Sequence, residues 1–260
     1  MAGYNGDDQP ATYAQLNGPV FVVVSSSNQV YISESHRIRK IDRNGIISTI
    51  AGNGERGSNG NGQLAANAQL HNPRGLFVTE DEEVFIADMW NLRVIKIDRN
   101  GIISTIHLGL FFSPSSVFQY KNEIYITDIG YGKIRKILQD GKAIIINTIE
   151  DDTGLDNTSP LTPYFVVVFN DELFVSYTNQ HMVRKIHLSN GNVETLIGNG
   201  NVGSSGDGSL AKNALLTNPG GIFVDENAQV YISDHSNHRI RRIDRNGIVD
   251  TIVGTGTPGY

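Results

Sequence analysis

The segment KIDRNGIISTI occurs twice without a change, from Lys40 to Ile50 and from Lys96 to Ile106. A third version, RIDRNGIVDTI, begins at Arg242. Copied segments of this kind predict an array of equivalent units, because one small sheet cannot bury both of its faces, whereas neighbouring copies can cover one another. The copies therefore constrain the fold before any single residue is considered.

Five units emerge when the chain is aligned on a proline that precedes an apolar run. These prolines are Pro19, Pro73, Pro114, Pro163 and Pro219. Each unit reads as four short strands, which in the second unit are GLFVTE, EVFIAD, RVIKID and GIISTI. We predict an all-β fold, a monomeric β-propeller of five four-stranded blades that forms a single domain over residues 1–260. The apolar runs VFVVV, YFVVV and GGIFV predict innermost strands that are buried on both faces.

An Asn-Gly or Asp-Gly pair occupies one position in every unit, between the third and fourth strands. The pairs are Asn44-Gly45, Asn100-Gly101, Asp140-Gly141, Asn190-Gly191 and Asn246-Gly247. Such pairs tolerate the positive φ that a tight hairpin requires. Five equivalent hairpins support the division into five blades.

Three of the segments between blades share a second pattern, seen in GNGQLAANAQLHNP from Gly60 and GDGSLAKNALLTNP from Gly206. Ala and Leu at helical spacing predict one or two helical turns, with Asp7, Asn61 or Asp207 near the N-cap. We expect the leucines of these linkers to pack between blades, with Phe111 in the place held elsewhere by Leu16, Leu70 and Leu216. The linker that begins at Ile149 is acidic and is predicted to be a loop.

The units resemble the NHL-repeat family, whose pattern contains YIAD or YISD followed by N-x-R. The resemblance is carried by FIADMWNLRVIKID from Phe85 and YISDHSNHRIRRID from Tyr231, and more weakly by VSYTNQHMVRKI from Val175. In YISESHRIRKID, from Tyr31, the loop is two residues shorter. The resemblance implies a propeller fold. Some members of the family are lyases that hold zinc through histidines, and others bind RNA. The resemblance therefore also implies these two alternatives.

A polar loop between the second and third strands recurs from blade to blade. We predict that its Asp and Asn side chains satisfy loop amides and that its Arg pairs with a carboxylate. The residues predicted to have this structural role are Asp88, Asn91, Arg93, Asp128, Asp234, Asn237 and Arg239.

The residues at the tips of these loops differ from blade to blade, whereas the strands repeat. In a blade of four up-and-down strands, the loop between the second and third strands and the linker to the next blade lie at the same end. The loop tips and the linkers therefore share one face. We therefore predict that this face binds a partner, with Trp90 as an anchor. The predicted binding residues are Trp90, Tyr131, Tyr177, His181, His235 and His238. The main hypothesis is a non-catalytic module that binds a protein or small ligand.

Two alternatives remain open, an NHL-like lyase or hydrolase with a metal in the central channel and an RNA-binding propeller. The formal charge of −6 argues against nucleic acid, because phosphate backbones are bound by clustered Lys and Arg. The seven histidines lack a close ligand spacing and the chain has no cysteine, so we predict no metal, no cofactor and no catalytic residue.

The N-terminal sequence MAGYNGDDQP lacks the basic and apolar regions of a secretion signal, and no apolar run is long enough to span a membrane. We expect a soluble protein without membrane insertion and favour the cytoplasm. The final GTGTPGY would continue into GYNGDDQPATYAQLNGP to complete the fifth linker. We interpret these boundaries as those of an excised or engineered domain.

Overall fold

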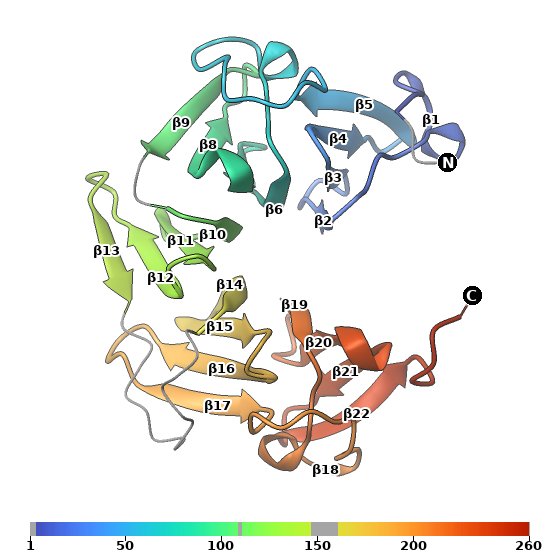
Figure 1. Ribbon diagram of the computed structural model, residues 1–260, viewed down its shortest axis with the longest axis vertical. Helices are drawn as coiled ribbons and strands as arrows, with labels where there is room; N and C mark the ends of the chain where they lie inside the picture. The colour runs from blue at the N-terminus through green and yellow to red at the C-terminus, as the bar shows by residue number, and fades with distance from the viewer. Residues whose placement is uncertain (1–3, 109–110, 147–160, 260) are drawn as a thin grey trace. The chain divides into compact units, whose positions relative to one another are not determined.

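The computed structural model describes residues 4–108, 111–146 and 161–259. Five antiparallel sheets are built from strands that follow one another along the chain (Figure 1), which confirms the all-β, five-bladed β-propeller. The chain divides into two compact units, Met1–Ile126 and Thr127–Tyr260, each with its own hydrophobic core. That all 260 residues form one domain stays a prediction, as do the monomeric state and the joining of the two ends.

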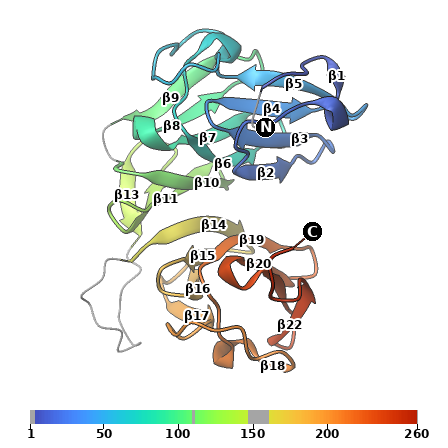
Figure 2. The same ribbon diagram turned by 45° about the vertical axis from the view of Figure 1, so that its right-hand side comes forward.

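The first unit contains blades 1 and 2 and the beginning of blade 3. Blade 1 consists of β2 (Phe21–Val24), β3 (Val30–Glu34), β4 (Arg37–Ile41) and β5 (Ile46–Ala51), and β1 (Gln9–Pro10) pairs with β5 as a fifth strand. Blade 2 consists of β6 (Pro73–Val78), β7 (Val84–Asp88), β8 (Arg93–Ile97) and β9 (Ile103–Leu108). The strands β2 and β3 pack on β6 (Figure 1 and Figure 2), so the core of this unit lies between the two sheets.

The second unit contains the remainder of blade 3 and blades 4 and 5. Blade 3 consists of β10 (Pro114–Tyr120), β11 (Glu123–Asp128), β12 (Lys133–Ile137) and β13 (Ala143–Ile146), and the boundary between the units falls within β11. Blade 4 consists of β14 (Pro163–Phe169), β15 (Glu172–Tyr177), β16 (Met182–His187) and β17 (Val193–Ile197). Blade 5 consists of β19 (Pro219–Val224), β20 (Val230–Asp234), β21 (Arg239–Ile243) and β22 (Ile248–Val253), and β18 (Ser209–Leu210) pairs with β22. The strands β14 and β15 pack on β19.

The hairpins between third and fourth strands confirm the requirement for glycine. All five of their glycines have a positive φ, between 75° and 81°. The turn spans four residues, and in blades 1, 2 and 5 an aspartate at its first position, Asp42, Asp98 or Asp244, stabilises it. Asp42 Oδ1 accepts hydrogen bonds of 2.8 Å from the amides of both Asn44 and Ile46. These contacts lower the pKa of Asp42, because the ionised carboxylate is the better acceptor.

The helical linkers are shorter than predicted. Each contains a single 3₁₀ turn, η1 (Ala11–Tyr13), η2 (Ala65–Asn67) or η4 (Ala211–Asn213). Their N-caps are Pro10, Leu64 and Leu210, without a side-chain cap. The assignment of Asp7, Asn61 and Asp207 to N-caps is therefore wrong, and these residues contact the blades instead. The burial of Leu70, Leu216 and Phe111 is confirmed, and Leu16 is half-buried.

The innermost strand of blade 1 is buried on one face only. Val22 and Val24 of β2 are 60% and 58% exposed, so the prediction of burial on both faces is wrong for this strand. It is wrong for β19 as well, where Phe223 is 63% exposed. The reason is that β2 packs on the core of its unit through Phe21 and Val23, and alternate residues of a strand point to the opposite face.

The acidic linker from Ile149 falls almost entirely outside the described residues. None of the described helices has the length and apolar character needed to cross a membrane.

Candidate functional site

The loop between β7 and β8 is organised around the carboxylate of Asp88, which is fully buried at the end of β7. Asp88 accepts hydrogen bonds from the His71 amide at 2.8 Å, from Asn91 Nδ2 at 2.7 Å and from Arg93 Nε at 2.8 Å. Burial raises the pKa of Asp88, whereas Arg93, Asn91 and the His71 amide act in the opposite direction. The structural role predicted for Asp88, Asn91 and Arg93 therefore agrees with their contacts.

The equivalent loop of blade 5 uses a different arginine from the one predicted. Asp234 accepts hydrogen bonds from Asn237 Nδ2 at 2.8 Å and from the Thr217 amide at 2.7 Å. Its arginine partner is Arg241, at 3.5 Å, whereas Arg239 donates to the carbonyl of Thr255 at 3.2 Å. The assignment of Arg239 to this ion pair is wrong, because the buried carboxylate is reached from the third residue of β21 and not from the first.

The third residue of the third strand is in several blades an arginine that pairs with a carboxylate, and the N-x-R pattern does not indicate it. Arg39 in β4 contacts Glu34 and Asp7, Arg135 in β12 contacts Asp128, and Arg241 contacts both Asp234 and Asp207. The signal is present in the sequence, as RIRKI, KIRKI and RIRRI. Blade 2 reads RVIKI, with isoleucine at this position, so Arg93 takes over the ion pair there. Arg93 also ties its loop to the preceding linker by donating to Ser58 O and Gln69 O.

Tyr177 does not belong to the binding surface. It ends β15 at the position that Asp88 and Asp234 occupy in their blades, and it is fully buried. Its ring lies 5.6 Å from the guanidinium of Arg184, the third residue of β16. Aligning FVSY with FIAD and YISD shows that Tyr177 takes the aspartate's place, so its role is structural.

The other predicted binding residues lie in loops and are divided between the two units. Trp90 belongs to the first unit and is 59% exposed. Tyr131 is 53% exposed and its ring lies 5.5 Å from the guanidinium of Arg135. His235 and His238 lie at the two ends of the blade 5 loop, whereas His181 is half-buried and accepts a hydrogen bond from the Asn218 amide.

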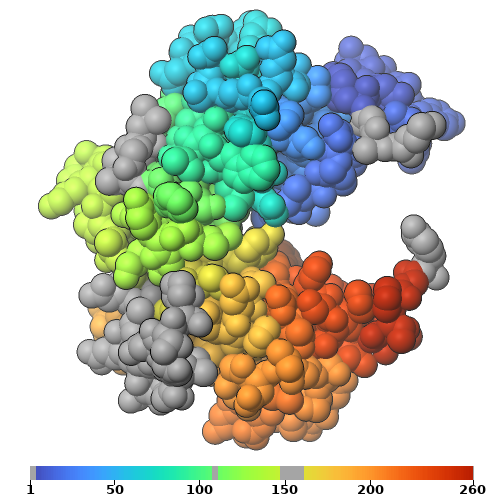
Figure 3. All heavy atoms as spheres, in the orientation of Figure 1, coloured from blue at the N-terminus to red at the C-terminus, as the bar shows by residue number. Residues whose placement is uncertain are grey.

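The first unit does contain a group of aromatic and basic side chains that includes Trp90. The Trp90 ring lies edge-on to that of His71, with centroids 4.9 Å apart, and the His71 ring lies 5.7 Å from that of His36. Next to His36 in the chain, the Arg37 guanidinium stacks on Tyr4, 3.6 Å from the ring centroid. We call these five residues, Tyr4, His36, Arg37, His71 and Trp90, the aromatic–arginine band. The spheres of blades 1 and 2, blue to green in Figure 3, form a continuous surface in this unit.

The band is held by the same contacts that fix the loop. The Trp90 amide donates to His71 O at 3.1 Å, Arg37 Nη2 donates to Asn53 O at 3.0 Å, and the Tyr4 hydroxyl donates to Asp7 at 2.7 Å. Burial lowers the pKa of His36, and the neighbouring His71, Arg37 and Arg56 lower it further. The band is therefore preorganised and carries positive charge on a chain that is negative overall.

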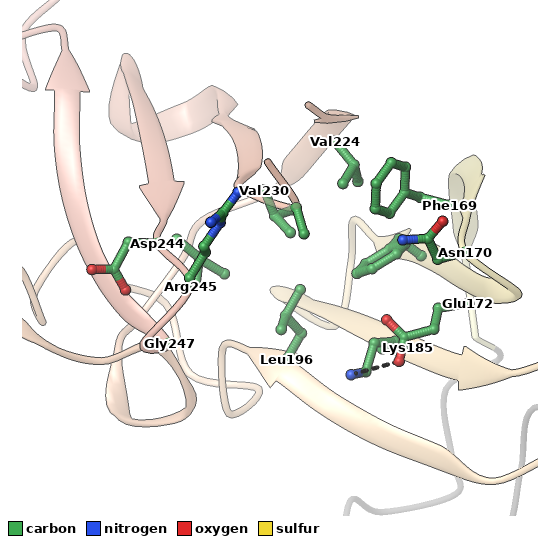
Figure 4. A pocket seen from close by; sticks show the side chains of 13 residues that line it. Phe169, Asn170, Glu172, Lys185, Leu196, Val224, Val230, Asp244, Arg245 and Gly247 are labelled. Atoms are coloured by element: carbon green, nitrogen blue, oxygen red, sulfur yellow. Dashed lines mark ion pairs between the residues drawn. The ribbon is translucent and has the colours of Figure 1, made fainter. Parts of the chain in front are cut away.

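A hollow at the opposite end of the strands is the other candidate. A groove of about 310 Å³ in the second unit lies between blades 4 and 5 (Figure 4) and has an apolar floor that includes Phe174, Leu196 and Val230. Lys185 Nζ contacts Glu172 at 3.1 Å and Glu194 at 2.6 Å. Burial lowers the pKa of Lys185, but hydrogen bonds to these carboxylates outweigh it. The charges of the groove thus neutralise one another.

A repeating array of four-stranded blades with aspartate-anchored loops defines an NHL-repeat propeller. The family model described as the teneurin NHL domain matches residues 3–59 and 109–258, and the chain therefore belongs to the teneurin NHL domain family. The resemblance seen in the sequence is confirmed.

Curated relatives are much longer than this chain. Protein suppressor of quenching 1, chloroplastic, from Arabidopsis thaliana is 29% identical over 96% of this chain and 27% of that protein. Teneurin-3 from Danio rerio is 25% identical over 93% of this chain and 8% of that protein. The chain thus spans about a quarter or less of the length of these two relatives.

Solved structures share the fold. A catalytically inactive virginiamycin B lyase from Staphylococcus aureus with quinupristin superposes with a TM-score of 0.65 at 18% identity, over 99% of this chain and 74% of that one. A nidogen/laminin complex gives a TM-score of 0.65 at 14% identity, over 90% of this chain and 79% of the matched chain. Within the part of the chain that the structure describes, no group of three or more His, Cys, Asp or Glu is arranged to hold a metal ion.

Proposed function

We propose that this domain is a rigid, non-catalytic protein-interaction module and that its partner binds to the aromatic–arginine band. The observation that supports this most strongly is the position of Trp90. Its ring is more than half exposed, yet it is fixed by His71 and by a loop that closes on the buried Asp88. A large side chain that is already ordered loses little conformational entropy on binding.

The composition of the band favours a protein partner. Trp, Tyr and Arg are the residues that most often dominate the free energy of protein association, and the band supplies one of each. One structure of the same fold comes from a nidogen/laminin complex, which is consistent with a propeller in this role. A lyase with a metal in the central channel and an RNA-binding propeller remain the alternatives.

Photo-cross-linking tests the proposal even while the partner is unidentified. A photoreactive phenylalanine analogue would replace Trp90 in one variant and Asn100, at the other end of the strands, in a second. We expect one protein to be cross-linked by the Trp90 variant in proportion to its abundance, and unlabelled wild-type chain to compete for it. Cross-linking from Asn100 alone would contradict the proposal.

A further inference from the structure

The outer strand of a blade has a free edge, and three blades cover that edge in the same way. In blade 1 the amides of Asp8 and Ala11 donate to the carbonyls of Ile47 and Gly45, at 2.8 Å each. In blade 2 Gly62 and Ala65 donate to Ile103 and Gly101, at 2.7 and 2.8 Å, and in blade 5 Gly208 and Ala211 donate to Val249 and Gly247, at 2.9 and 2.8 Å. Two carbonyls are thus used in each case, that of the turn glycine and that of the second residue after it.

The segment that covers the edge is supplied by the linker that precedes the blade. Its extended dipeptide is Gln9-Pro10, Gln63-Leu64 or Ser209-Leu210, followed at once by a 3₁₀ turn. The second residue of the dipeptide lies opposite Ile46, Ile102 or Ile248. As a result, Ile47, Ile103 and Val249 are almost completely buried.

Blade 3 has no such cover among the described residues. The strand β13 is the last in its sheet. Between β5 and β6 the chain has residues 52–72 available as a linker, but between β9 and β10 it has only residues 109–113. Ile144 and Ile145 of β13 are 39% and 47% exposed.

The backbone of β13 presents the same two carbonyls to the outside. The Leu138 amide donates to Lys142 O at 2.9 Å, so these two residues form a hydrogen-bonded pair beside the turn. The next pair, Ile137 and Ala143, is therefore a non-hydrogen-bonded pair, whose outward N–H and C=O groups are available to a further strand. Gly141 O and Ala143 O correspond to the carbonyls that the linkers occupy in the other blades.

One difference between the blades indicates what kind of segment this edge would take. The residue opposite the second position of the dipeptide is isoleucine in blades 1, 2 and 5, but in blade 3 it is Lys142, which is exposed. Directly opposed side chains on adjacent strands share a face, and opposite charges there stabilise the pairing. An acidic residue fits opposite Lys142 better than leucine.

We propose that blade 3 binds, on the edge of β13, an extended segment of a partner protein that carries an acidic residue opposite Lys142. The segment adds as an antiparallel strand and donates its amides to Gly141 O and Ala143 O, in the manner of strand addition to an exposed sheet edge. This edge shares no residue with the aromatic–arginine band and does not depend on the function proposed for it.

Peptides based on the chain's own linker test this proposal on the full chain. The parent peptide has the sequence of residues 206–218, GDGSLAKNALLTN, and two others carry Glu or Lys in place of Leu210. We expect the Glu peptide to bind about two- to fivefold more tightly than the parent, and the Lys peptide to bind less tightly than the parent. Binding should also protect the outward amide of Ala143 from hydrogen exchange, as the linker does for Ile103, whose amide donates to Gln63 O.

Variants of the chain locate the binding to β13. Lys142→Glu should reverse the order of the Glu and Lys peptides, because the charge opposite their variable residue changes sign. Ala143→Pro removes the outward N–H without touching the pairing with β12, and it should weaken all three peptides about fivefold or more. The control Ile252→Lys, a 40% exposed isoleucine on the covered strand β22, should leave the affinities unchanged.

Three results would overturn the proposal. The first is the same order of peptide affinities for wild type and Lys142→Glu. The second is the absence of protection of the Ala143 amide at the highest soluble peptide concentration. The third is concentration-dependent dimerisation of the chain that Ile145→Lys abolishes, which would show that a second copy, and not a partner protein, occupies the edge.

Discussion

Arg93 Nε donates a hydrogen bond of 2.8 Å to Asp88 Oδ2, and both side chains are buried. The pair does more than close the β7–β8 loop. Arg93 also donates to two carbonyls of the preceding linker, and Asp88 accepts the amide of His71. The support of Trp90 and the attachment of the linker to blade 2 therefore depend on one ion pair.

Replacing Asp88 should have a large effect on stability. Asp88→Ala leaves the buried Arg93 without its counter-charge, and we expect the free energy of unfolding to fall by about 3–5 kcal/mol. Urea denaturation of the variant measures this loss. The control is Asp81→Ala, which removes an exposed ion pair with Arg99 and should change the free energy by less than about 1 kcal/mol. Equal effects of the two substitutions would show that the buried pair does not stabilise the fold.

The two arginines of β21 provide a matched comparison. Arg241 is fully buried and contacts Asp234 and Asp207, whereas Arg239 donates to the carbonyl of Thr255 at the protein surface. We expect Arg241→Ala to lower the free energy of unfolding by about 3–5 kcal/mol and Arg239→Ala by about 1 kcal/mol or less. Thermal and urea unfolding of the two variants measure these losses. A larger loss for Arg239→Ala than for Arg241→Ala would contradict the assignment of Arg241 as the partner of Asp234.

The repeated strands and turns can be predicted from the sequence because the same pattern recurs in each blade. Five turn glycines at one position indicate the number of blades, and FIAD and YISD identify Asp88 and Asp234 as the anchors of their loops. The choice between Arg239 and Arg241 cannot be made from N-x-R spacing alone, since which residue of the strand meets the carboxylate depends on the loop's geometry. Comparison with RVIKI would indicate the correct arginine, because Ile95 occupies the third position of the strand, where the other blades have an arginine.

The candidate site is harder to predict than the frame. Trp90 stands out in the sequence because it is a solitary tryptophan on a loop tip, but its neighbour His71 comes from a linker and joins it only through tertiary packing. The binding role predicted for Tyr177 is wrong because an aromatic residue at the start of a variable loop resembles a binding residue. In the fold it fills the space that an aspartate occupies in other blades.

Stability should depend on the protonation of His36. The pKa of His36 is lowered in the folded chain, so the unfolded chain takes up the proton first as the pH falls. The free energy of unfolding should therefore decrease as the pH falls below about 6.5, the ordinary pKa of histidine, and level off below the folded pKa. We expect His36→Gln to reduce this decrease, leaving the part due to His181, whose pKa is also lowered. An unchanged pH profile in His36→Gln would contradict the role of His36.

The non-catalytic proposal predicts that the protein carries no tightly bound metal. Chain purified without chelators should contain zinc and calcium well below one equivalent when its metals are determined by elemental analysis. One equivalent that survives dialysis, and that is lost in a variant with His36 and His71 both replaced by alanine, would instead favour the lyase alternative.

The affinity of the cross-linked partner for the Trp90→Ala variant tests the central claim most directly. Because Trp90 is exposed and its loop is anchored by Asp88, the substitution should leave the unfolding midpoint nearly unchanged and weaken binding by about 1–4 kcal/mol. Arg37→Ala should weaken it as well, while substitutions of Glu80, Asp81 and Asn100 at the other end of the strands should not. Full affinity in the Trp90→Ala and Arg37→Ala variants, with binding lost on substitution of Glu80, Asp81 or Asn100, would contradict the account.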